Sequence, residues 1–258
     1  SMKQHGFKMC LILGGAAKNV EQQQLQESNL VIATPGRCLD HLTNTQFNYK
    51  NLKYLVLDEA DQLIDSGFDQ TIKMIVIKLP KDKMTYLFSA TMTSKVEDLA
   101  VLSLRKNPLR IGLQDSTTVS TLEQKYVQVP ADKKYAALLH ILTENQGKKM
   151  ICFVAIKKAV DYVAYLLEQC GIANIALHGS MTQQKRTQTY NDFMAGKTAN
   201  IMICTDVAAR GLDFPNVDLI IQCDLPEQFS NYFHRIGRTA RAGRQGTALL
   251  MLTPKEIS

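Results

Sequence analysis

The sequence contains no apolar run that approaches the roughly 18 residues of a membrane-spanning helix, and no N-terminal signal peptide is visible. Its six cysteines include no C-x-x-C pair, which argues against a zinc site or a redox motif of that spacing. Four of them stand in apolar runs, where a free thiol behaves as a small buried hydrophobe: Cys10, Cys152, Cys204 and Cys223. We therefore expect an intracellular, reduced protein without a disulfide framework.

A basic tail is also absent. The chain has 30 Lys and Arg residues against 24 Asp and Glu residues, and its net charge of +6 is spread over both halves. Hydrophobic residues make up 45% and charged residues 21%, an ordinary composition for a globular protein. A polyanion would therefore have to be bound by local clusters of residues rather than by the bulk charge of the chain.

The sequence lacks a G-x-x-x-x-G-K-[ST] phosphate-binding loop, although Gly196-Lys197-Thr198 resembles the end of one. The earlier glycine would have to stand where the chain has Asn191. The residues before Gly196 have the pattern of a helix, whereas a phosphate loop follows a strand. We therefore interpret Gly196 as the glycine that ends a helix.

What the chain does contain is an alternation of short apolar runs and amphipathic stretches, the rhythm of parallel βαβ units. The runs predict strands at residues 9–13, 30–33, 53–57, 85–88, 109–113, 124–129, 150–154, 174–177, 200–204, 219–223 and 248–252. Helical patterns lie between them, for example at residues 156–169 and 183–194. A polar break at residues 114–120 predicts a linker between a first domain, residues 1–113, and a second, residues 121–258.

Polar residues directly follow several of these predicted strands. The clusters are Thr34-Pro35-Gly36-Arg37, Asp58-Glu59-Ala60-Asp61, Ser89-Ala90-Thr91, His178-Gly179-Ser180 and Thr205-Asp206. In open parallel sheets, ligands bind outside the carboxyl ends of the strands. We therefore expect the clusters to line one edge of each domain.

Asp58 and Glu59 form a carboxylate pair at the end of a predicted strand. Such a carboxylate can hold Mg²⁺ on a nucleotide, directly or through water, and its neighbour can orient the attacking water in phosphoryl transfer. Taken alone, the pair would more often cap the following helix. Ser89 and Thr91 could hydrogen-bond a carboxylate such as Asp61, and alone they too would more often be helix caps.

Arginines are concentrated in His234-Arg235-Ile236-Gly237-Arg238-Thr239-Ala240-Arg241. A guanidinium group cannot lose its charge, and its planar fork matches phosphate oxygens. On a helix, Arg238 and Arg241 would share a face, with Arg235 one turn earlier. Such a pair could stabilise charge on a transferred phosphoryl group. The alternative interpretation is a solvated basic helix.

A further polar segment runs from Thr205 to Asp213. Backbone amides at the start of a helix after Thr205 would suit a nucleic-acid phosphate. Asp213, after Gly211, stands where a turn could present its carboxylate to a ribose hydroxyl. A capped turn between a strand and a helix is the alternative.

In this order across two α/β halves, Asp58-Glu59-Ala60-Asp61, Ser89-Ala90-Thr91 and residues 234–241 resemble the DEAD-box family of superfamily 2 RNA helicases. The resemblance covers nearly the whole chain, from Gly14-Gly15 to Arg241-Ala242-Gly243. It implies an α/β fold of two RecA-like parallel-sheet domains in tandem, which bind ATP, Mg²⁺ and single-stranded or duplex RNA. The implied activity is ATP hydrolysis that unwinds short RNA duplexes or remodels RNA–protein complexes in RNA processing.

The resemblance also implies roles for individual residues. Asp58 would bind Mg²⁺ through water, and Glu59 would act on the hydrolytic water. Arg238 and Arg241 would reach the γ-phosphate, and Gly211 and Asp213 would bind ATP. Asp61, Ser89, Thr91 and His234 would couple ATP use to strand separation. Contacts to the RNA backbone would fall on Gly14, Gly15, Thr34, Arg37, Gly179, Gln183, Arg186 and Thr205.

Three motifs of the family precede Gly14-Gly15, and residues 1–13 supply none of them: the adenine-reading Q motif, the phosphate loop and the first RNA-contacting motif. We therefore expect the first domain to be truncated at its N-terminus and to expose apolar surface. The 258 residues by themselves would then not be catalytically competent. The main alternative is that they act only as a binding module for RNA or a protein.

A DNA helicase or translocase of the same superfamily is another alternative, but the tetrad and His234 favour RNA. Residues 57–94 and 125–129 resemble the eukaryotic group that works in ribosomal RNA maturation. This resemblance implies the nucleus or nucleolus as the compartment. We expect a monomer that has no contact with membranes.

Overall fold

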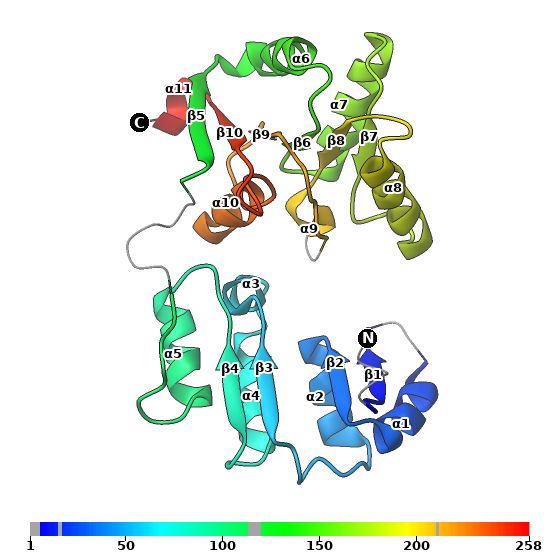
Figure 1. Cartoon of the computed structure of the whole chain (residues 1–258), viewed down its shortest axis with the longest axis vertical. Helices are drawn as coiled ribbons and strands as arrows, with labels where there is room; N and C mark the ends of the chain where they lie inside the picture. Colours follow the sequence, from blue (N-terminus) through cyan, green and yellow to red (C-terminus); the bar gives the residue numbers. More distant parts are fainter. Residues whose placement is uncertain (1–5, 15–16, 113–119, 210–211, 258) are drawn as a thin grey trace. The chain divides into compact units, whose positions relative to one another are not determined.

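The computed structural model describes residues 6–14, 17–112, 120–209 and 212–257. The chain divides into two compact units, Ser1–Ile111 and Gly112–Ser258, which we call the first and the second unit and describe separately (Figure 1). Gly15, Gly211 and residues 114–119 of the predicted linker lie outside the described residues. Within the described ranges, no helix has the length and apolarity needed to span a bilayer.

The second unit is built on a parallel sheet whose described strands have the order β5-β10-β9-β6-β8-β7. The strands are β5 (Leu122–Gln128), β6 (Met150–Phe153), β7 (Ile175–Leu177), β8 (Ile201–Cys204), β9 (Leu219–Gln222) and β10 (Gly246–Leu252). The helices are η2 (Ala131–Lys133), α6 (Lys134–Glu144), α7 (Lys157–Gln169), α8 (Gln183–Ala195), α9 (Asp206–Ala209), α10 (Phe229–Ile236) and α11 (Pro254–Ile257). A parallel sheet with crossover helices is the architecture that the sequence predicts.

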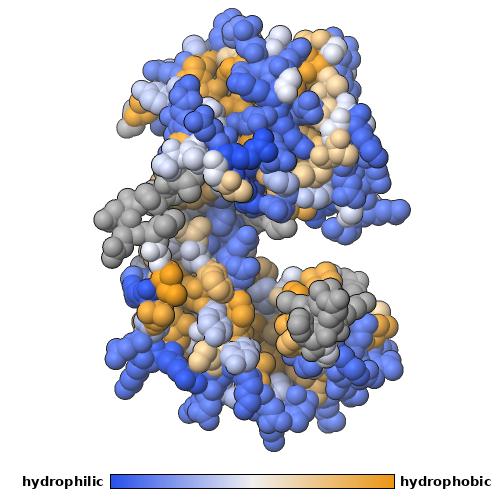
Figure 2. Space-filling view, viewed as in Figure 1, coloured by the Kyte–Doolittle hydropathy of each residue, from blue (hydrophilic) through white to orange (hydrophobic). Residues whose placement is uncertain are grey.

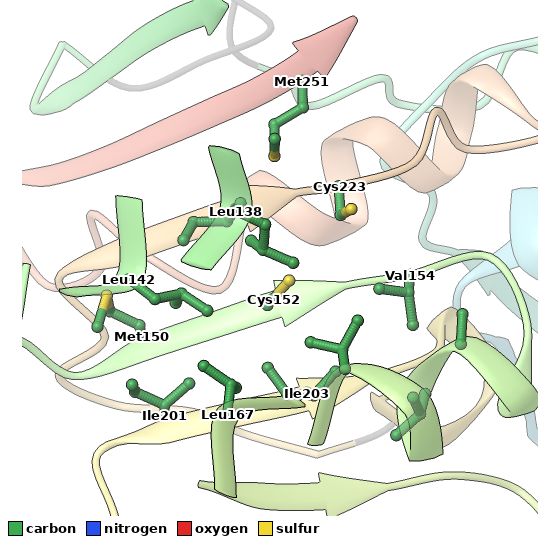
Figure 3. Packing of buried hydrophobic residues seen from close by; sticks show 14 of the residues in the cluster. Leu138, Leu142, Met150, Cys152, Val154, Leu167, Ile201, Ile203, Cys223 and Met251 are labelled. Carbon is green, nitrogen blue, oxygen red and sulfur yellow. The ribbon is translucent and has the colours of Figure 1, made fainter. Parts of the chain in front are cut away.

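Alternate residues of the central strands face two separate helix layers. In β6, Met150 and Cys152 belong to a cluster with α6 and α7, whereas Ile151 and Phe153 belong to a second cluster with α8 and α10. Figure 3 shows the first cluster, in which Leu138 of α6 packs over the sheet. Strands that are apolar on both faces are typical of a parallel sheet covered by helices on both sides.

The first unit contains two parallel strand pairs covered by helices. β1 (Met9–Ile12) pairs with β2 (Leu30–Ala33), and β3 (Tyr54–Leu57) pairs with β4 (Met84–Leu87). The helices are α1 (Lys18–Glu27), α2 (Pro35–Asn44), α3 (Ala60–Asp65), α4 (Asp69–Lys78) and α5 (Ser94–Ser103). Leu42 of α2 and Ile75 of α4 are buried in one cluster, against which Leu55 of β3 packs. This cluster connects the helix that follows β2 to the second strand pair.

One face of the β3–β4 pair carries large apolar side chains that remain exposed. Tyr54 and Val56 of β3 are 64% and 56% exposed, and Tyr86 of β4 is 43% exposed. The rings of Tyr54 and Tyr86 stack with their centroids 6.3 Å apart. Figure 2 shows hydrophobic surface over this part of the first unit. The first unit therefore exposes apolar surface, as the sequence predicts.

Most of the predicted elements are confirmed with ends shifted by at most two residues. Gly196 ends α8 in the left-handed conformation, φ 61°, as interpreted from the sequence. The strand predicted at residues 109–113 is wrong for its described part, because residues 109–112 have no regular structure. No described strand pairs with this segment, and Leu109 and Ile111 are 85% and 88% exposed. The apolar run is a surface segment.

Candidate functional site

The predicted polar clusters lie at the carboxyl ends of paired strands. The last paired residues are Leu57 with Leu87, Ile12 with Ala33, and Leu177 with Cys204. The clusters that contain Asp58, Thr34 and Thr205 begin directly after these residues. Because parallel strands end at the same edge, each strand pair brings its polar residues together, as the sequence predicts for parallel sheets.

Asp58 and Glu59 form the turn between β3 and α3. The Oδ1 atom of Asp58, an exposed residue, accepts the backbone N–H of Glu59 at 3.0 Å. Glu59 has the left-handed backbone conformation, φ 49° and ψ 50°, immediately before α3. For a residue other than glycine this conformation costs on the order of 1–3 kcal/mol, and such strain is concentrated at functional sites. The turn is therefore held in a conformation that local preferences disfavour.

The carboxylate pair fits a magnesium ion that is bound mainly by water and phosphate. Mg²⁺ takes oxygen ligands, keeps several waters and commonly needs only one or two protein carboxylates. In the part of the chain that the structure describes, no group of three or more His, Cys, Asp or Glu side chains could hold a metal by itself. Asp58 and Glu59 supply carboxylate oxygens for a Mg²⁺ ion whose other ligands are water and phosphate. They do not supply a complete set of protein ligands.

Asp61 joins the end of β3 to the end of β4. Its side chain is almost fully buried, with 1% exposed, and its Oδ2 atom accepts both the Thr91 hydroxyl at 2.9 Å and the Thr91 backbone N–H at 3.0 Å. The Ser89 hydroxyl donates to the Thr91 carbonyl at 2.7 Å and accepts the Asp61 N–H at 3.3 Å. The predicted bond between Asp61 and the hydroxyl cluster is confirmed.

Arg37 lies in the first turn of α2 and is held by an acidic residue of α1. Its Nε atom donates to Glu21 Oε2 at 2.7 Å. The same carboxylate bonds His41 Nε2 at 2.9 Å and accepts the Leu13 backbone N–H at 3.2 Å. Gly14 and Thr34, in contrast, are exposed at the same edge of the β1–β2 pair. The structure therefore brings Gly14, Thr34 and Arg37 into one region.

In the second unit, four predicted RNA-binding residues lie in or beside α8 and α9: Gly179, Gln183, Arg186 and Thr205. Arg186 Nη2 donates to the Ala208 carbonyl at 3.1 Å, and Nη1 lies 3.5 Å from Gln183 Oε1. A Cβ atom on Gly179 would lie 4.0 Å from Val207 Cγ1. The helix expected after Thr205 begins at Asp206 and is described as far as Ala209 as α9. The amides of Ala208 and Ala209 donate to the Thr205 carbonyl.

Arg235 is a structural residue rather than part of an exposed phosphate-binding pair. Its Nε and Nη2 atoms donate to the two carboxylate oxygens of Asp206 at 2.6 Å and 2.7 Å, and Nη1 donates to the Asp224 carbonyl at 2.6 Å. The guanidinium lies over the ring of Phe153, 5.2 Å from its centroid. Arg235 is 1% exposed. The grouping of Arg235 with the phosphate-binding arginines is therefore wrong.

Arg238 and Arg241 do not share a helix face, because α10 ends at Ile236 and both arginines lie in the following loop. Arg238 is 8% exposed and its Nη1 donates to the Leu212 carbonyl. Arg241 is more exposed, donating from Nε to the Gly237 carbonyl at 2.6 Å and from Nη1 to the carboxylate of Asp213. His234 is half-buried in the last turn of α10. The loop therefore brings Arg238 and Arg241 to the segment that contains Asp213.

Sequence reasoning missed Glu21 and the pairing of Asp206 with Arg235. The sequence holds a signal for Glu21 in its spacing, because a residue four positions before Leu25 shares a helix face with it. The structure buries both side chains on α1. A recess of about 330 Å³ lies elsewhere, at the amino edge of the second unit's sheet, lined by turns that include Gly147, Gly171 and Gly196. It contains none of the predicted site residues.

Comparison with known families matches both units. The family model of the DEAD/DEAH box helicase matches residues 1–99, and that of the helicase conserved C-terminal domain matches residues 133–243. The probable ATP-dependent RNA helicase ddx18 of Dictyostelium discoideum is 47% identical over 262 residues, which is 99% of this chain and 43% of that protein. The chain thus spans less than half the length of this relative.

Two solved structures extend the comparison. The Dbp5 protein of Saccharomyces cerevisiae bound to RNA and ADP BeF3 is 30% identical, with a TM-score of 0.82 over 97% of this chain and 65% of that one. A DEAD box protein from Methanococcus jannaschii is 34% identical, with a TM-score of 0.55 over 97% of this chain and 68% of that one. With both family models matched in order, the chain consists of RecA-like helicase domains and belongs to the DEAD-box helicase family.

Proposed function

We propose that the full-length protein to which this chain belongs is an ATP-dependent RNA helicase. It hydrolyses ATP to unwind short RNA duplexes or to remodel RNA–protein complexes. The observation that carries the proposal is the bonding of the buried Asp61, two residues after Glu59. Its carboxylate accepts the Thr91 hydroxyl and N–H at 2.9 and 3.0 Å, and its backbone N–H donates to the Ser89 hydroxyl at 3.3 Å. An enzyme that couples ATP hydrolysis to RNA strand separation requires a connection between the turn that binds the nucleotide and the neighbouring loop.

The chemistry of ATP hydrolysis falls to Asp58, Glu59, Arg238 and Arg241. When bound, Mg²⁺ would neutralise charge on the phosphates beside Asp58. Glu59 orients the attacking water and accepts its proton. The guanidinium groups of Arg238 and Arg241 bind the γ-phosphate, with Asp213 on the ATP ribose. In the structure the Arg241 guanidinium donates to the Asp213 carboxylate, so both side chains would exchange this partner for the nucleotide.

RNA contacts fall to the exposed backbone at Gly14, Thr34 and Gly179, to Gln183 and Thr205, and to the side chains of Arg37 and Arg186. Gly15 and Gly211 keep the roles that the family resemblance implies. These groups would bind phosphates and 2′-hydroxyls rather than base edges, so recognition would be largely independent of sequence. For the 258 residues alone we expect weak RNA binding without ATP turnover, because the sequence has no phosphate loop.

We further propose that the protein serves ribosomal RNA maturation in the nucleolus. The support is the resemblance of residues 57–94 and 125–129 to the eukaryotic helicases of that process, together with 47% identity to the ddx18 protein of a eukaryote. Fractionation of cells that carry the tagged protein tests the compartment. Enrichment in the cytosol instead of nucleoli would contradict it.

The test of the proposed activity is strand separation by the full-length protein with a short RNA duplex and a DNA duplex of the same sequence. We expect the RNA duplex, but not the DNA duplex, to be separated when ATP is present. The 2′-hydroxyl is the physical difference between the two substrates. Equal separation of the DNA duplex would favour a DNA helicase or translocase. No separation of either duplex, with RNA binding retained, would favour a binding module.

Arg238→Ala is the matched loss-of-function variant, and Arg244→Ala is its control. Both arginines lie in the loop after α10, but Arg244 is bonded to the side chain of Asn216 and has no proposed role in hydrolysis. We expect ATP-dependent separation to disappear only in Arg238→Ala. Equal loss in both variants would mean that the loop, rather than the Arg238 guanidinium, is what matters.

A further inference from the structure

Glu21 makes contacts at both polar segments of the β1–β2 edge. One carboxylate oxygen, Oε1, accepts the backbone N–H of Leu13, the residue before Gly14. The other, Oε2, bonds Arg37 Nε at 2.7 Å and His41 Nε2 at 2.9 Å. A single side chain on α1 is thus bonded to the loop that follows β1 and to the helix that follows β2.

This carboxylate is inaccessible to ligands itself. Glu21 is 3% exposed and His41 1%, while the Arg37 side chain is 18% exposed. His41 is held in turn through Nδ1, which lies 2.9 Å from the Thr45 hydroxyl. A buried carboxylate is stable only when it is paired and hydrogen-bonded, and these three donors meet that requirement. The arrangement is therefore buried and hydrogen-bonded on its inner side and partly open at Arg37.

Neighbouring charges leave Arg37 with more than one acidic partner. Asp40 Oδ2 lies 4.0 Å from Arg37 Nη1 and 2.8 Å from Lys18 Nζ. The 2.7 Å bond from Nε to Glu21 is shorter and more buried than the contact with Asp40. Because a guanidinium is planar, a bond at Nε fixes the direction of the whole group.

We propose that Glu21 is the positioning residue of the RNA-binding edge of the first unit. It orients the guanidinium of Arg37 and holds the backbone of Leu13, the residue before Gly14. Arg37 and Gly14 can then contact the same RNA backbone. The inference rests on the proposed function, because it requires that Arg37 and Gly14 contact RNA. Glu21 itself does not touch the RNA.

Glutamine cannot replace this carboxylate without loss. A carboxylate has two acceptor oxygens, and here both are used; glutamine has one acceptor and an NH₂ group that only donates. In Glu21→Gln, the NH₂ group must therefore face either the Leu13 N–H or the donors of Arg37 and His41. The side chain keeps its size but loses the ability to hold both segments.

The experiment measures the affinity of the full-length protein for a fluorescein-labelled uridine decamer, with a non-hydrolysable ATP analogue present. We expect Glu21→Gln and Arg37→Ala each to weaken binding about tenfold, the range of a lost charge-assisted hydrogen bond. Glu27→Gln is the control, since Glu27 lies on the same helix and forms an exposed pair with Lys8. It should bind RNA as the unsubstituted protein does.

A double variant separates positioning from a general loss of stability. If Glu21 acts by positioning, adding Glu21→Gln to Arg37→Ala should cost less than Glu21→Gln costs by itself, because only the Gly14 segment is then left to position. Fully additive losses, about a hundredfold together, would overturn the inference. A normal affinity in Glu21→Gln beside a weakened Arg37→Ala would also overturn it and leave the proposed function intact. A normal affinity in Arg37→Ala would instead overturn the RNA contact assigned to Arg37, and the inference with it.

Arg37→Lys provides a second route if Glu21→Gln does not fold. Lysine keeps the charge but has a single nitrogen, which cannot bond Glu21 and also face a phosphate in a fixed direction. We expect Arg37→Lys to lose nearly as much affinity as Arg37→Ala. Unchanged affinity in Arg37→Lys would mean that charge alone suffices and that Glu21 has no positioning role.

Discussion

The hydroxyl of Thr91 donates to the buried carboxylate of Asp61, thirty residues earlier in the chain, at 2.9 Å. The backbone N–H of Thr91 reaches the same oxygen at 3.0 Å, so the contact has two parts. Only the hydroxyl part can be removed by substitution. This permits a selective test of the link between the turn after β3 and the loop after β4.

Thr91→Val is expected to uncouple ATP use from duplex separation. The substitution keeps the shape of the side chain and the backbone bond but removes the hydroxyl donor. We expect RNA-stimulated ATP turnover to remain while the rate of RNA duplex separation falls at least about tenfold, a change of roughly 1.4 kcal/mol in the coupled step. Both rates are measured on the same preparation of the full-length protein.

Thr93→Val is the control for this substitution. Thr93 Oγ1 accepts the Val96 N–H as the cap of α5 and is outside the Asp61 network. Loss of this capping hydroxyl should cost about 1 kcal/mol of stability. It should not change the ratio of the rate of RNA duplex separation to the rate of ATP turnover. A ratio that changes equally in both variants would contradict the coupling role of Thr91.

The pair of the buried Arg235 and the partly exposed Asp206 should contribute strongly to the stability of the second unit. Asp206→Asn leaves the Arg235 guanidinium buried without its counter-charge, which typically costs about 3–5 kcal/mol. Asp213→Asn breaks the exposed bond with Arg241 and should cost at most about 1 kcal/mol. Urea unfolding of the two variants measures the difference. Similar losses would contradict the structural role that we assign to Arg235.

These two pairs show why sequence alone could not assign the arginines. The sequence predicted the parallel strands and the polar residues after them, because strand periodicity and strand-end chemistry are local properties. It could not predict that α10 ends at Ile236, which removes Arg238 and Arg241 from a common helix face. Nor could it distinguish Arg235 from the other arginines, because burial against Phe153 depends on packing between distant segments.

Gly246, the first residue of β10, should not tolerate a side chain. A Cβ atom there would lie 2.1 Å from Thr239 Oγ1 and 2.6 Å from the backbone nitrogen of Ala240. Thr239 is itself bonded to the Val217 carbonyl, so the loop that contains Arg238 cannot move freely. We expect Gly246→Ala to destabilise the second unit by about 1–3 kcal/mol, the usual cost of overpacking.

Thermal unfolding checks this prediction, with Gly112→Ala as the control. A Cβ atom on Gly112 would meet no heavy atom within 4 Å. The control should therefore unfold within a degree or so of the unsubstituted chain, whereas Gly246→Ala should unfold several degrees lower. An unchanged melting temperature in Gly246→Ala would show that the loop relaxes at little cost.

Glu21 should make the stability of the first unit depend on pH. Burial by itself would raise the pKa of Glu21, but hydrogen bonds from His41, Arg37 and the Leu13 N–H hold that pKa below its usual value of 4.5. A carboxyl group with a lowered folded-state pKa contributes stability above its unfolded pKa. That contribution is lost as the pH falls from about 4.5 through the lower folded value.

The difference in unfolding free energy between the unsubstituted chain and Glu21→Gln isolates this contribution, since other carboxylates titrate in both. We expect the difference to be constant from pH 7 to about pH 5 and to shrink below pH 4.5. A difference that stays the same down to pH 3 would mean that Glu21 is not charged and paired in the folded state.

The most direct test of the account is ATP turnover by the full-length protein carrying Glu59→Gln, measured with saturating RNA. Glu97→Gln is the control, because the Glu97 side chain forms an exposed pair with Arg110 and has no proposed role in hydrolysis. We predict that Glu59→Gln abolishes RNA-stimulated turnover while ATP and RNA still bind, and that Glu97→Gln is unaffected. Undiminished turnover in Glu59→Gln would contradict the assignment of this turn as the hydrolytic centre.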